Sequence, residues 1–426
     1  MDHECIVVAA KPVEERKTIS RKTEQHSSSS VPYDILNDPS LNYQIKVSLP
    51  SNYNFDIPRI IWKMRETGSN RVALQFPEGL FIFSTAIATI IEQFTDATAF
   101  IIGDVTYGAC CVEDYLASLA NCTLLVHFGH SCLIPFNNIV SGVKVLYIVV
   151  EIQFDYWNFI ETVKLNFEDK KHENIAVFGT IQFIDSVNKA VQELNTEGYN
   201  MVVPQIRPLS RGEILGCTAP ILDRNTSIVL FVADGRFHME AVMIANPWVA
   251  TYYKYNPYDK CITIESYDYP EMITQRRRSI AQAVKVLEKG GVFGFILGTL
   301  GRQGSPKVLE NMVNRFKKEA PNCQHVTLLI PEIKPPLLKE LGDSVDIWVQ
   351  TSCPRLSIDW GDEFKDHPLL NPYEFNLTMD SFMNSKPSET ILSSQEKNGY
   401  PMDFYASASL GNWTPIHRCN KTCDCK

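Results

Sequence analysis

The chain has 426 residues, of which 45% are hydrophobic and 21% are charged, and it carries a net charge of −9 at pH 7. This balance is typical of a globular protein with about two to four domains, and the acidic charge argues against binding to nucleic acid. The apolar runs are too short to span a membrane and the first residues do not resemble a secretory signal. We therefore expect a cytoplasmic protein without membrane contact, whose twelve cysteines are thiols or metal ligands rather than disulfides.

The first 55 residues are polar and include four consecutive serines at 27–30, so we expect a largely disordered tail over 1–55. Hydrophobic periodicity divides the remainder into three α/β domains and a loop-rich tail with a cysteine-rich end. The expected bounds are 56–165, 166–285, 286–385 and 386–426. A cluster of three arginines at 276–278 opens a predicted helix, where we expect a solvated face.

The first domain begins with a short β run at 72–76, and apolar residues then recur at helical spacing from Ile87 to Phe94. A second strand at 98–102 leads into the segment GDVTYGACC, which contains Cys110. A further strand, 123–128, runs into the segment VHFGHSC at 126–132.

The second domain repeats this order, with a strand at 175–178, a helix from Val187 to Leu194, and a strand at 201–206. Cys217 follows in RGEILGC, before a strand at 227–232.

The third domain has strands at 292–297, 326–330 and 345–349, and the last of these precedes Cys353. Units of this kind form parallel sheets with right-handed crossovers. Three similar units in one chain indicate an internal triplication of an α/β fold.

Cys110, Cys217 and Cys353 each lie where a predicted strand runs into a loop, at matching positions of the three units. Ligands of open α/β sheets collect at the carboxyl ends of strands, so the three thiolates can converge on one centre. A four-iron cluster normally takes four protein ligands, and three cysteines would leave one iron open for a substrate. The sequence therefore predicts a 4Fe–4S site on these residues.

The other cysteines are weaker candidates. Cys111 should point away from the centre because neighbouring side chains on an extended backbone alternate. Cys132 lies near a strand end and is a minor candidate ligand, whereas a structural role is expected for Cys122, Cys261 and Cys323.

Two histidines and the C-terminal cysteines remain. His127 and His130 flank a turn, and hydrogen-bonded loop histidines are the favoured interpretation. The tail pattern CxxxCxC is consistent with a metal site or with exposed thiols of no fixed role, and the sequence leaves both open. Its residues are Cys419, Cys423 and Cys425, beside His417.

The glycine-rich segment LGTLGRQG, at 297–304, follows a strand and precedes a helix. Such a loop suits an anionic ligand at a helix N-terminus. We predict that it holds the carboxylate of a small substrate, and that two residues just past Cys353 face the same cavity. The predicted binding residues are Gly298, Gly301, Arg302, Gly304, Arg355 and Asp359.

Several long segments resemble a known family: GDVTYGACCVEDY, LVHFGHSCLIP, PLSRGEILGC, ILGTLGRQGS, CPRLSIDWG and YPMDFYA. They are similar to subunit 1 of the eukaryotic 2-(3-amino-3-carboxypropyl)histidine synthases, which begin diphthamide biosynthesis. The resemblance runs from about Arg71 to Trp413. It implies a triangle of three related α/β domains around a central 4Fe–4S cluster, with Cys110, Cys217 and Cys353 as its ligands.

The resemblance also implies a reaction. The family transfers the 3-amino-3-carboxypropyl group of S-adenosylmethionine to imidazole C2 of a histidine in elongation factor 2. That carbon is a poor nucleophile, so an electron from the cluster cleaves the Cγ–S bond, which releases a carbon radical and methylthioadenosine. The implied partners are subunit 2 in a heterodimer, elongation factor 2 and a small reducing protein.

Two alternatives stay open on the sequence alone. A quinolinate-synthase-like enzyme also has three α/β domains and three cluster cysteines, but its cluster acts as a Lewis acid in a dehydration. A non-catalytic subunit of the same heterodimer would use the cluster only to relay electrons or as a scaffold.

Overall fold

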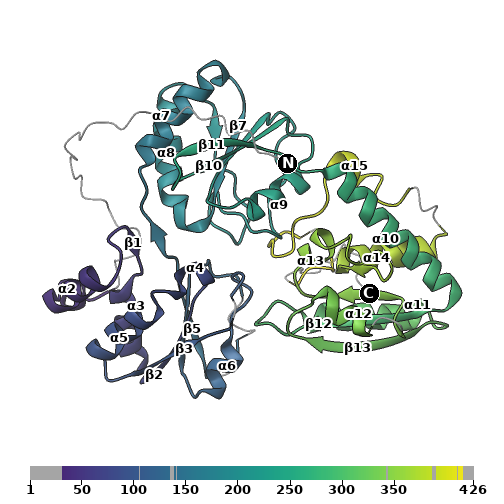
Figure 1. Ribbon diagram of the computed structural model, residues 1–426, viewed down its shortest axis with the longest axis horizontal. Helices are drawn as coiled ribbons and strands as arrows, with labels where there is room; N and C mark the ends of the chain where they lie inside the picture. Colours follow the sequence, from purple (N-terminus) through teal and green to yellow (C-terminus); the bar gives the residue numbers. More distant parts are fainter. Residues whose placement is uncertain are drawn as a thin grey trace.

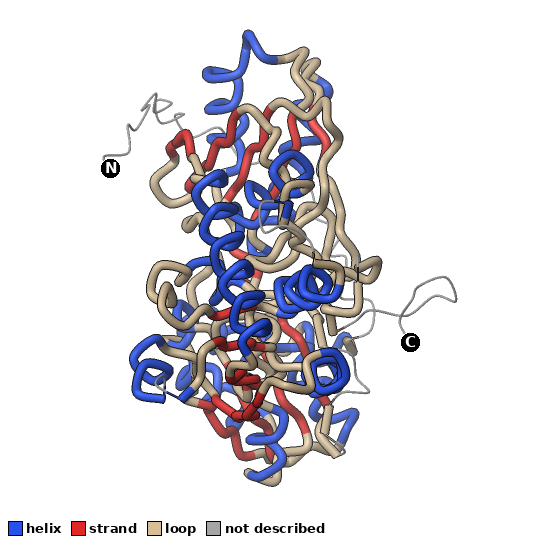
Figure 2. Tube along the Cα trace, turned by 90° about the vertical axis from the view of Figure 1, so that its right-hand side faces the viewer, coloured by secondary structure: helices blue, strands red, loops and turns tan. Residues whose placement is uncertain are grey.

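Three sheets, each formed by one part of the chain, are the framework of the molecule. The computed structural model describes residues 31–104, 106–134, 139–140, 142–341, 344–385, 390–409 and 411–415. Figure 1 shows the three units at the corners of a triangle, and the molecule is thinner in the side view of Figure 2. The units therefore lie side by side, which confirms the predicted α/β fold of three related domains. No helix in the described part of the chain has the length and apolar character needed to cross a membrane.

The first sheet is parallel and has the order β3-β2-β4-β5. Its strands are β2 (Arg71–Gln75), β3 (Thr98–Ile102), β4 (Leu124–Phe128) and β5 (Lys144–Ile148). The accompanying helices are α3 (Ile57–Thr67), α4 (Glu78–Phe81), α5 (Ser84–Phe94) and α6 (Asp114–Leu119). The apolar periodicity of α5 buries Ile87, Ile90 and Ile91 against this sheet, as the sequence predicts.

The second sheet has the order β11-β10-β9-β7-β8, and only the β10–β11 pair is antiparallel. Its strands are β7 (Ile175–Gly179), β8 (Met201–Val202), β9 (Ile228–Val232), β10 (Thr251–Asn256) and β11 (Cys261–Glu265). The helical segments are α7 (Tyr156–Phe167), η3 (Glu168–Lys170), η4 (Ile181–Phe183), α8 (Ile184–Thr196) and α9 (Phe237–Ala245). The predicted strand over 201–206 is wrong beyond Val202, because Pro204 has no N–H to donate to a ladder.

The third sheet is parallel, with the order β13-β12-β14-β15. Its strands are β12 (Val292–Gly298), β13 (Gln324–Ile330), β14 (Ile347–Gln350) and β15 (Leu369–Leu370). Its helices are α10 (Tyr269–Lys289), α11 (Pro306–Glu319), α12 (Pro335–Leu341), α13 (Arg355–Asp359), α14 (Pro372–Met383) and α15 (Gln395–Asn398).

All three sheets share one strand order. If the strands of each unit are numbered along the chain, the order is second, first, third, fourth, and only the second sheet adds an antiparallel edge strand. This common topology agrees with the predicted triplication. The predicted domain bounds each enclose one sheet, and the bounds themselves stay a prediction.

The cysteines do not occupy matching positions, however. Cys110 and Cys217 follow the second strand of their units, whereas Cys353 follows the third strand, β14. The prediction of matching positions is wrong in this respect. Because the first strand lies between the second and third in the sheet, both positions still flank the same central strand at its carboxyl end.

The predicted N-terminal tail is partly ordered. Residues 1–30 lie outside the described residues, but 31–55 form α1 (Tyr33–Leu36), α2 (Pro39–Ser48) and β1 (Tyr53–Asn54), which pairs with β6 (Glu151–Ile152). The carboxylate of Asp38 caps α2 by accepting hydrogen bonds from the N–H groups of Ser40 and Leu41. Leu41 and Leu49 are buried in the core of the first domain, so the prediction of disorder is wrong for this segment.

A buried ion pair ties α10 to α14. Arg276 Nε lies 2.6 Å from Oε1 of Glu374, and Nη2 lies 2.7 Å from Oε2. Both side chains are at most 1% exposed, and Tyr400 donates a further hydrogen bond to Glu374. The predicted solvated face is therefore wrong for Arg276, although Arg278 is exposed. The pair holds the long helix that joins the second and third domains.

The glycine-rich loop 297–304 joins the third domain to the first. Gly301 has a φ of +52°, and a Cβ added there would lie 2.4 Å from the carbonyl carbon of Cys111. The N–H of Arg302 donates to the carbonyl of Cys110 at 2.8 Å, and its guanidinium pairs with the buried carboxylate of Asp114. The loop therefore packs directly on the backbone that carries Cys110.

Replacing Arg276 with methionine should leave the carboxylate of Glu374 buried without its cation. We expect Arg276→Met to lower the free energy of unfolding by about 3–5 kcal/mol, measured by urea denaturation. Arg278→Met, on the exposed face of the same helix, should change it by less than about 0.5 kcal/mol. Equal effects of the two substitutions would contradict the buried pair.

Adding one methyl group at Gly301 should strain the contact between the first and third domains. Gly301→Ala combines a positive φ with a steric clash, and we expect it to lower the free energy of unfolding by about 1–3 kcal/mol. A Cβ at Gly235 meets no atom within 4 Å, so Gly235→Ala is the matched control and should have little effect. Wild-type stability of the Gly301 variant would show that the loop is not closely packed.

Candidate functional site

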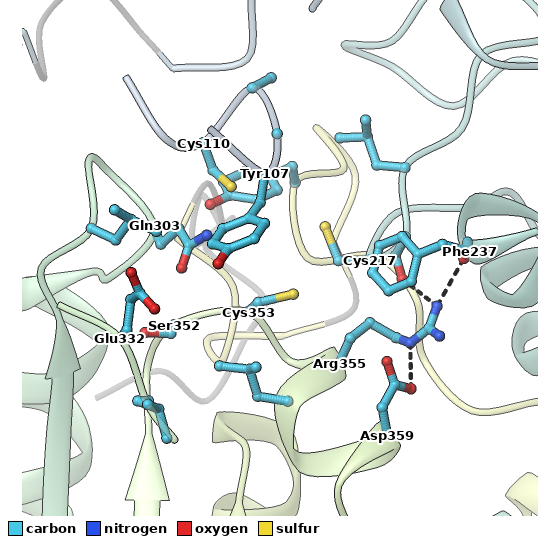
Figure 3. A pocket seen from close by; sticks show the side chains of 18 of the residues that line it. Tyr107, Cys110, Cys217, Phe237, Gln303, Glu332, Ser352, Cys353, Arg355 and Asp359 are labelled. Carbon is cyan, nitrogen blue, oxygen red and sulfur yellow. Dashed lines mark hydrogen bonds and ion pairs between the residues drawn. The ribbon is translucent and has the colours of Figure 1, made fainter. Parts of the chain in front are cut away.

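The three predicted cysteines meet at one cavity. Cys110, Cys217 and Cys353 all line a space of about 540 Å³ at the centre of the molecule. Figure 3 shows their side chains, one from each domain, facing this common space. The structure thus brings together three residues that are more than 100 positions apart in sequence.

Hydrogen bonds to the backbone position each cysteine. The carbonyl of Cys111, beside Cys110, accepts from Nε2 of Gln75 at 2.7 Å. The carbonyl of Cys353 accepts from Nε2 of Gln350 at 2.9 Å and from the first turn of α13.

Cys217 lies in a tight turn. The N–H of Leu215 donates to the carbonyl of Thr218 at 2.9 Å, and the N–H of Thr218 donates back at 3.2 Å. A Cβ at Gly216 would lie 2.2 Å from the ring of Phe237, so only glycine allows this approach. The turn is therefore held against α9 with its sulfur directed to the cavity.

Burial disfavours the charged form of the three thiols. It raises the pKa of Cys217 to about 12 and the pKa of Cys353 to about 11, and the charge of Cys353 adds to the shift at Cys217. The hydrogen bond with Cys111, together with burial, raises the pKa of Cys110. Bound metal compensates such buried thiolates, because coordination replaces the proton.

The donor set fits a cluster better than a single ion. In the described part of the chain, no three His, Cys, Asp or Glu side chains lie close enough to hold one metal ion. A cluster of several irons is wider than one ion and suits sulfurs that are further apart. Cys111 is buried outside the cavity, where Gln303 donates to its sulfur at 3.3 Å, and Cys132 does not line the cavity.

Arg355 lines the cavity but is already extensively paired. Its guanidinium donates to the carbonyls of Gly216 and Phe237 and to the carboxylates of Glu240 and Asp359. These contacts use four of its five N–H groups. Arg355 therefore connects the second and third domains beside the cysteines, and its cation favours nearby thiolates.

The predicted substrate-binding residues fall into two groups. Arg355 and Asp359 line the cavity, whereas Gly298, Gly301, Arg302 and Gly304 do not. The guanidinium of Arg302 instead lies between Asp114 and the ring of Tyr115, 4.2 Å from the ring centre. Two other residues of the loop, Leu300 and Gln303, do line the cavity, and binding of a small substrate by the loop stays a prediction.

The histidines form a buried chain beside the site. His127 is fully buried, with Nδ1 2.8 Å from the amide oxygen of Gln75 and Nε2 3.1 Å from Nδ1 of His130. Burial lowers the pKa of His130 and of His238 to about 4, so both are neutral at pH 7. The predicted hydrogen-bonded role fits His127 and His130, while His238 lines the cavity.

Sequence reasoning missed most of the cavity wall. Besides the cysteines, polar and aromatic side chains from all three domains and from the C-terminal segment line it: Tyr107, Phe237, His238, Gln303, Glu332, Lys334 and Tyr405. Tyr107 and Gln303 lie in segments that the sequence singled out, and Tyr405 lies in YPMDFYA. Phe237 and His238 stand in no motif, so no sequence signal indicated them.

Comparison with known proteins places the chain in a family. Residues 76–389 match the family model described as "Putative diphthamide synthesis protein". The chain is 46% identical over 393 residues to 2-(3-amino-3-carboxypropyl)histidine synthase subunit 1 of Gallus gallus, covering 92% of this chain and 90% of the relative. The Homo sapiens protein of the same name is 45% identical over 390 residues, with 92% and 83% coverage.

A solved structure shows the same fold. The Pyrococcus horikoshii protein described as Dph2 with a 4Fe–4S cluster superposes with a TM-score of 0.62 at 24% identity, covering 77% of this chain and 91% of that chain. The family match, which spans more than half of the sequence, and the close relatives over nine-tenths of it lead to one conclusion: this chain belongs to the diphthamide synthesis protein family.

Proposed function

We propose that this chain is subunit 1 of a 2-(3-amino-3-carboxypropyl)histidine synthase and acts in the first step of diphthamide biosynthesis. The reaction transfers the 3-amino-3-carboxypropyl group of S-adenosylmethionine to imidazole C2 of a histidine in elongation factor 2. The observation that carries this proposal is the meeting of Cys110, Cys217 and Cys353 at one buried cavity. The relatives that bear this name match the chain over nine-tenths of its length.

Cys110, Cys217 and Cys353 would hold a 4Fe–4S cluster through three of its irons. When bound, the cluster supplies the electron that cleaves the Cγ–S bond of S-adenosylmethionine, with release of methylthioadenosine. No fourth cysteine lines the cavity among the described residues, so one coordination position is left for the substrate. The guanidinium of Arg355 partly offsets the negative charge that the thiolates bring into this buried place.

The cavity wall suits a reactive substrate. Most of it is apolar, and the aromatic rings of Tyr107, Phe237 and Tyr405 come from three different segments. The ring of Tyr405 is buried and shields the inner wall from water, whereas Tyr107 is 64% and Phe237 47% exposed, so the cavity is open to solvent on their side. A volume of about 540 Å³ is in the range of small-molecule sites.

We assign the substrate's amino-acid end to the side of the cavity formed by Arg355 and Asp359. Arg355 keeps one N–H beyond its four contacts with protein, and a carboxylate can accept from it. Gln303 adds an amide at the same cavity. Gly301 and Arg302 of the glycine loop pack on the Cys110 segment, and this packing holds Gln303 of the same loop at the cavity.

The subunit number in the relatives' name implies a multi-subunit synthase, and we propose that subunit 2 is the partner. The edge strand β13 supports this proposal, because Val326 is 40% exposed and Leu329 is 69% exposed. An apolar edge strand of seven residues is a typical surface for pairing with another chain. A small reducing protein is the expected electron donor.

The ligand assignment can be tested by iron content. Cys110→Ala, Cys217→Ala and Cys353→Ala should each lose most of the iron and the brown absorbance of the anaerobically reconstituted protein. Cys132→Ala and Cys261→Ala should keep both, because neither side chain lines the cavity. A wild-type protein that binds stoichiometric zinc and no iron would contradict the assignment.

The activity can be tested by anaerobic reconstitution with subunit 2, reductant, S-adenosylmethionine and elongation factor 2. Mass analysis should find the added group on one histidine, and methylthioadenosine should form in equal amount. We expect the rate to fall by more than about tenfold without subunit 2. Dehydration chemistry without methylthioadenosine would favour the quinolinate-synthase-like alternative, and full activity of subunit 2 alone would favour a scaffold role.

A further inference from the structure

The C-terminal segment 399–407 crosses back onto the second domain beside Cys217. The N–H of Ala219 donates to the carbonyl of Met402 at 2.8 Å, and Asp403 forms an antiparallel bridge with Thr218. The N–H of Phe404 donates to the carbonyl of Cys217 at 3.2 Å. Figure 3 shows this part of the chain as a pale yellow ribbon passing beside Cys217. The segment is therefore bonded to the same turn that carries a cysteine ligand.

Both ends of the segment are anchored. At Gly399, φ is +85° and an added Cβ would lie 2.0 Å from the carbonyl oxygen of Ala245, so the chain passes close to the end of α9. The hydroxyl of Tyr400 donates to Glu374 at 2.9 Å, within the buried ion pair of the third domain. At the far end, the N–H of Ser407 donates to the carbonyl of Arg207 at 2.8 Å. These contacts hold the segment in one position against two domains.

The path of segment 399–407 places Tyr405 at the cavity that the three cysteines line. Its N–H donates to the hydroxyl of Thr218 at 3.1 Å, and its ring packs against Phe404 with 5.1 Å between ring centres. The residue is 4% exposed and lines the cavity together with Cys110, Cys217 and Cys353. Its phenol is therefore a hydrogen-bond donor on the wall of the cavity that the three cysteines share.

We propose that the phenol of Tyr405 donates a hydrogen bond to a sulfur of the cluster and so raises its reduction potential. This inference rests on the proposed function, since it needs the cluster on the three cysteines. Hydrogen bonds to sulfur are one of the levers by which proteins set cluster potentials, and they favour the more negative, reduced state. No bond is made or broken at Tyr405. Its role is to make the cluster easier to reduce by the one electron that then cleaves S-adenosylmethionine.

The reduction potential of the protein with its cluster bound tests this role. Tyr405→Phe removes only the hydroxyl, and we expect the equilibrium constant for one-electron reduction to fall by roughly tenfold, which corresponds to about 59 mV. Replacement of Tyr405 by 3-fluorotyrosine keeps the shape and makes the phenol a stronger donor, so the potential should rise. The measurement is a redox titration followed by the electron paramagnetic resonance signal of the reduced cluster, with iron content measured in parallel.

Tyr400→Phe is the matched control. It removes a buried hydroxyl from the same segment, but Tyr400 does not line the cavity, so stability should fall while the potential stays unchanged. Unchanged potentials in both Tyr405 variants would overturn the inference and leave the proposed function intact. If Tyr405→Phe fails to retain iron, the reduction potential of the 3-fluorotyrosine variant alone tests the inference. A wild-type chain that binds no cluster would instead contradict the proposed function.

Discussion

Three sulfurs have to be brought together in the interior, and much of the structure follows from that requirement. Thiolates are unfavourable where water is excluded, as the raised pKa values of Cys217 and Cys353 show. Metal ligation removes this penalty because coordination replaces the proton, and rigid loops that already hold the sulfurs in place make the binding tighter. The backbone contacts of Gly301 and Gly216 and the interdomain pairing of Arg355 supply that rigidity. The positions of the three sulfurs are thus fixed by contacts of the surrounding loops rather than by contacts between the cysteines themselves.

The repeated strand order explains how one fold supplies three similar loops. In each unit the first strand lies between the second and the third. The loops that follow the second and third strands therefore both lie beside the carboxyl end of the first strand. Two units use the loop after the second strand and the third unit uses the loop after the third strand. Equivalent sheets have therefore been adapted at different positions to serve one centre.

The elements of the sheets could be predicted from sequence because buried strands and amphipathic helices leave strong periodic patterns. The strand Ile175–Gly179 and the helix around Ile87 are examples. Cys353 could be predicted from a strand end because it lies directly after β14, whereas Cys110 and Cys217 lie in longer loops after β3 and β8, where the resemblance of their segments to the family was the stronger signal. The sequence predicted a solvated face for Arg276 and substrate binding for Arg302, but both arginines form ion pairs within the protein. Their partners, Glu374 and Asp114, lie far away in sequence, and residue spacing carries no information about such contacts. The ordering of 31–55 was missed because the apolar residues of this segment, such as Ile35, Leu41 and Leu49, stand among Pro, Asn and Ser, and the sequence does not show that they pack on the first sheet.

The return of the chain to the centre at 399–407 has a consequence for synthesis of the protein. The ribosome produces this segment after all three sheets have emerged, so the cavity lacks part of its wall until this segment has also been made. A nonsense codon shortly after Met383 would leave every strand in place and remove the strip that covers Cys217. Such a truncated product would also lose Ile391, Leu392, Tyr400 and Met402 from the core, so it would be less stable as well as open at its centre to oxygen and to foreign metals.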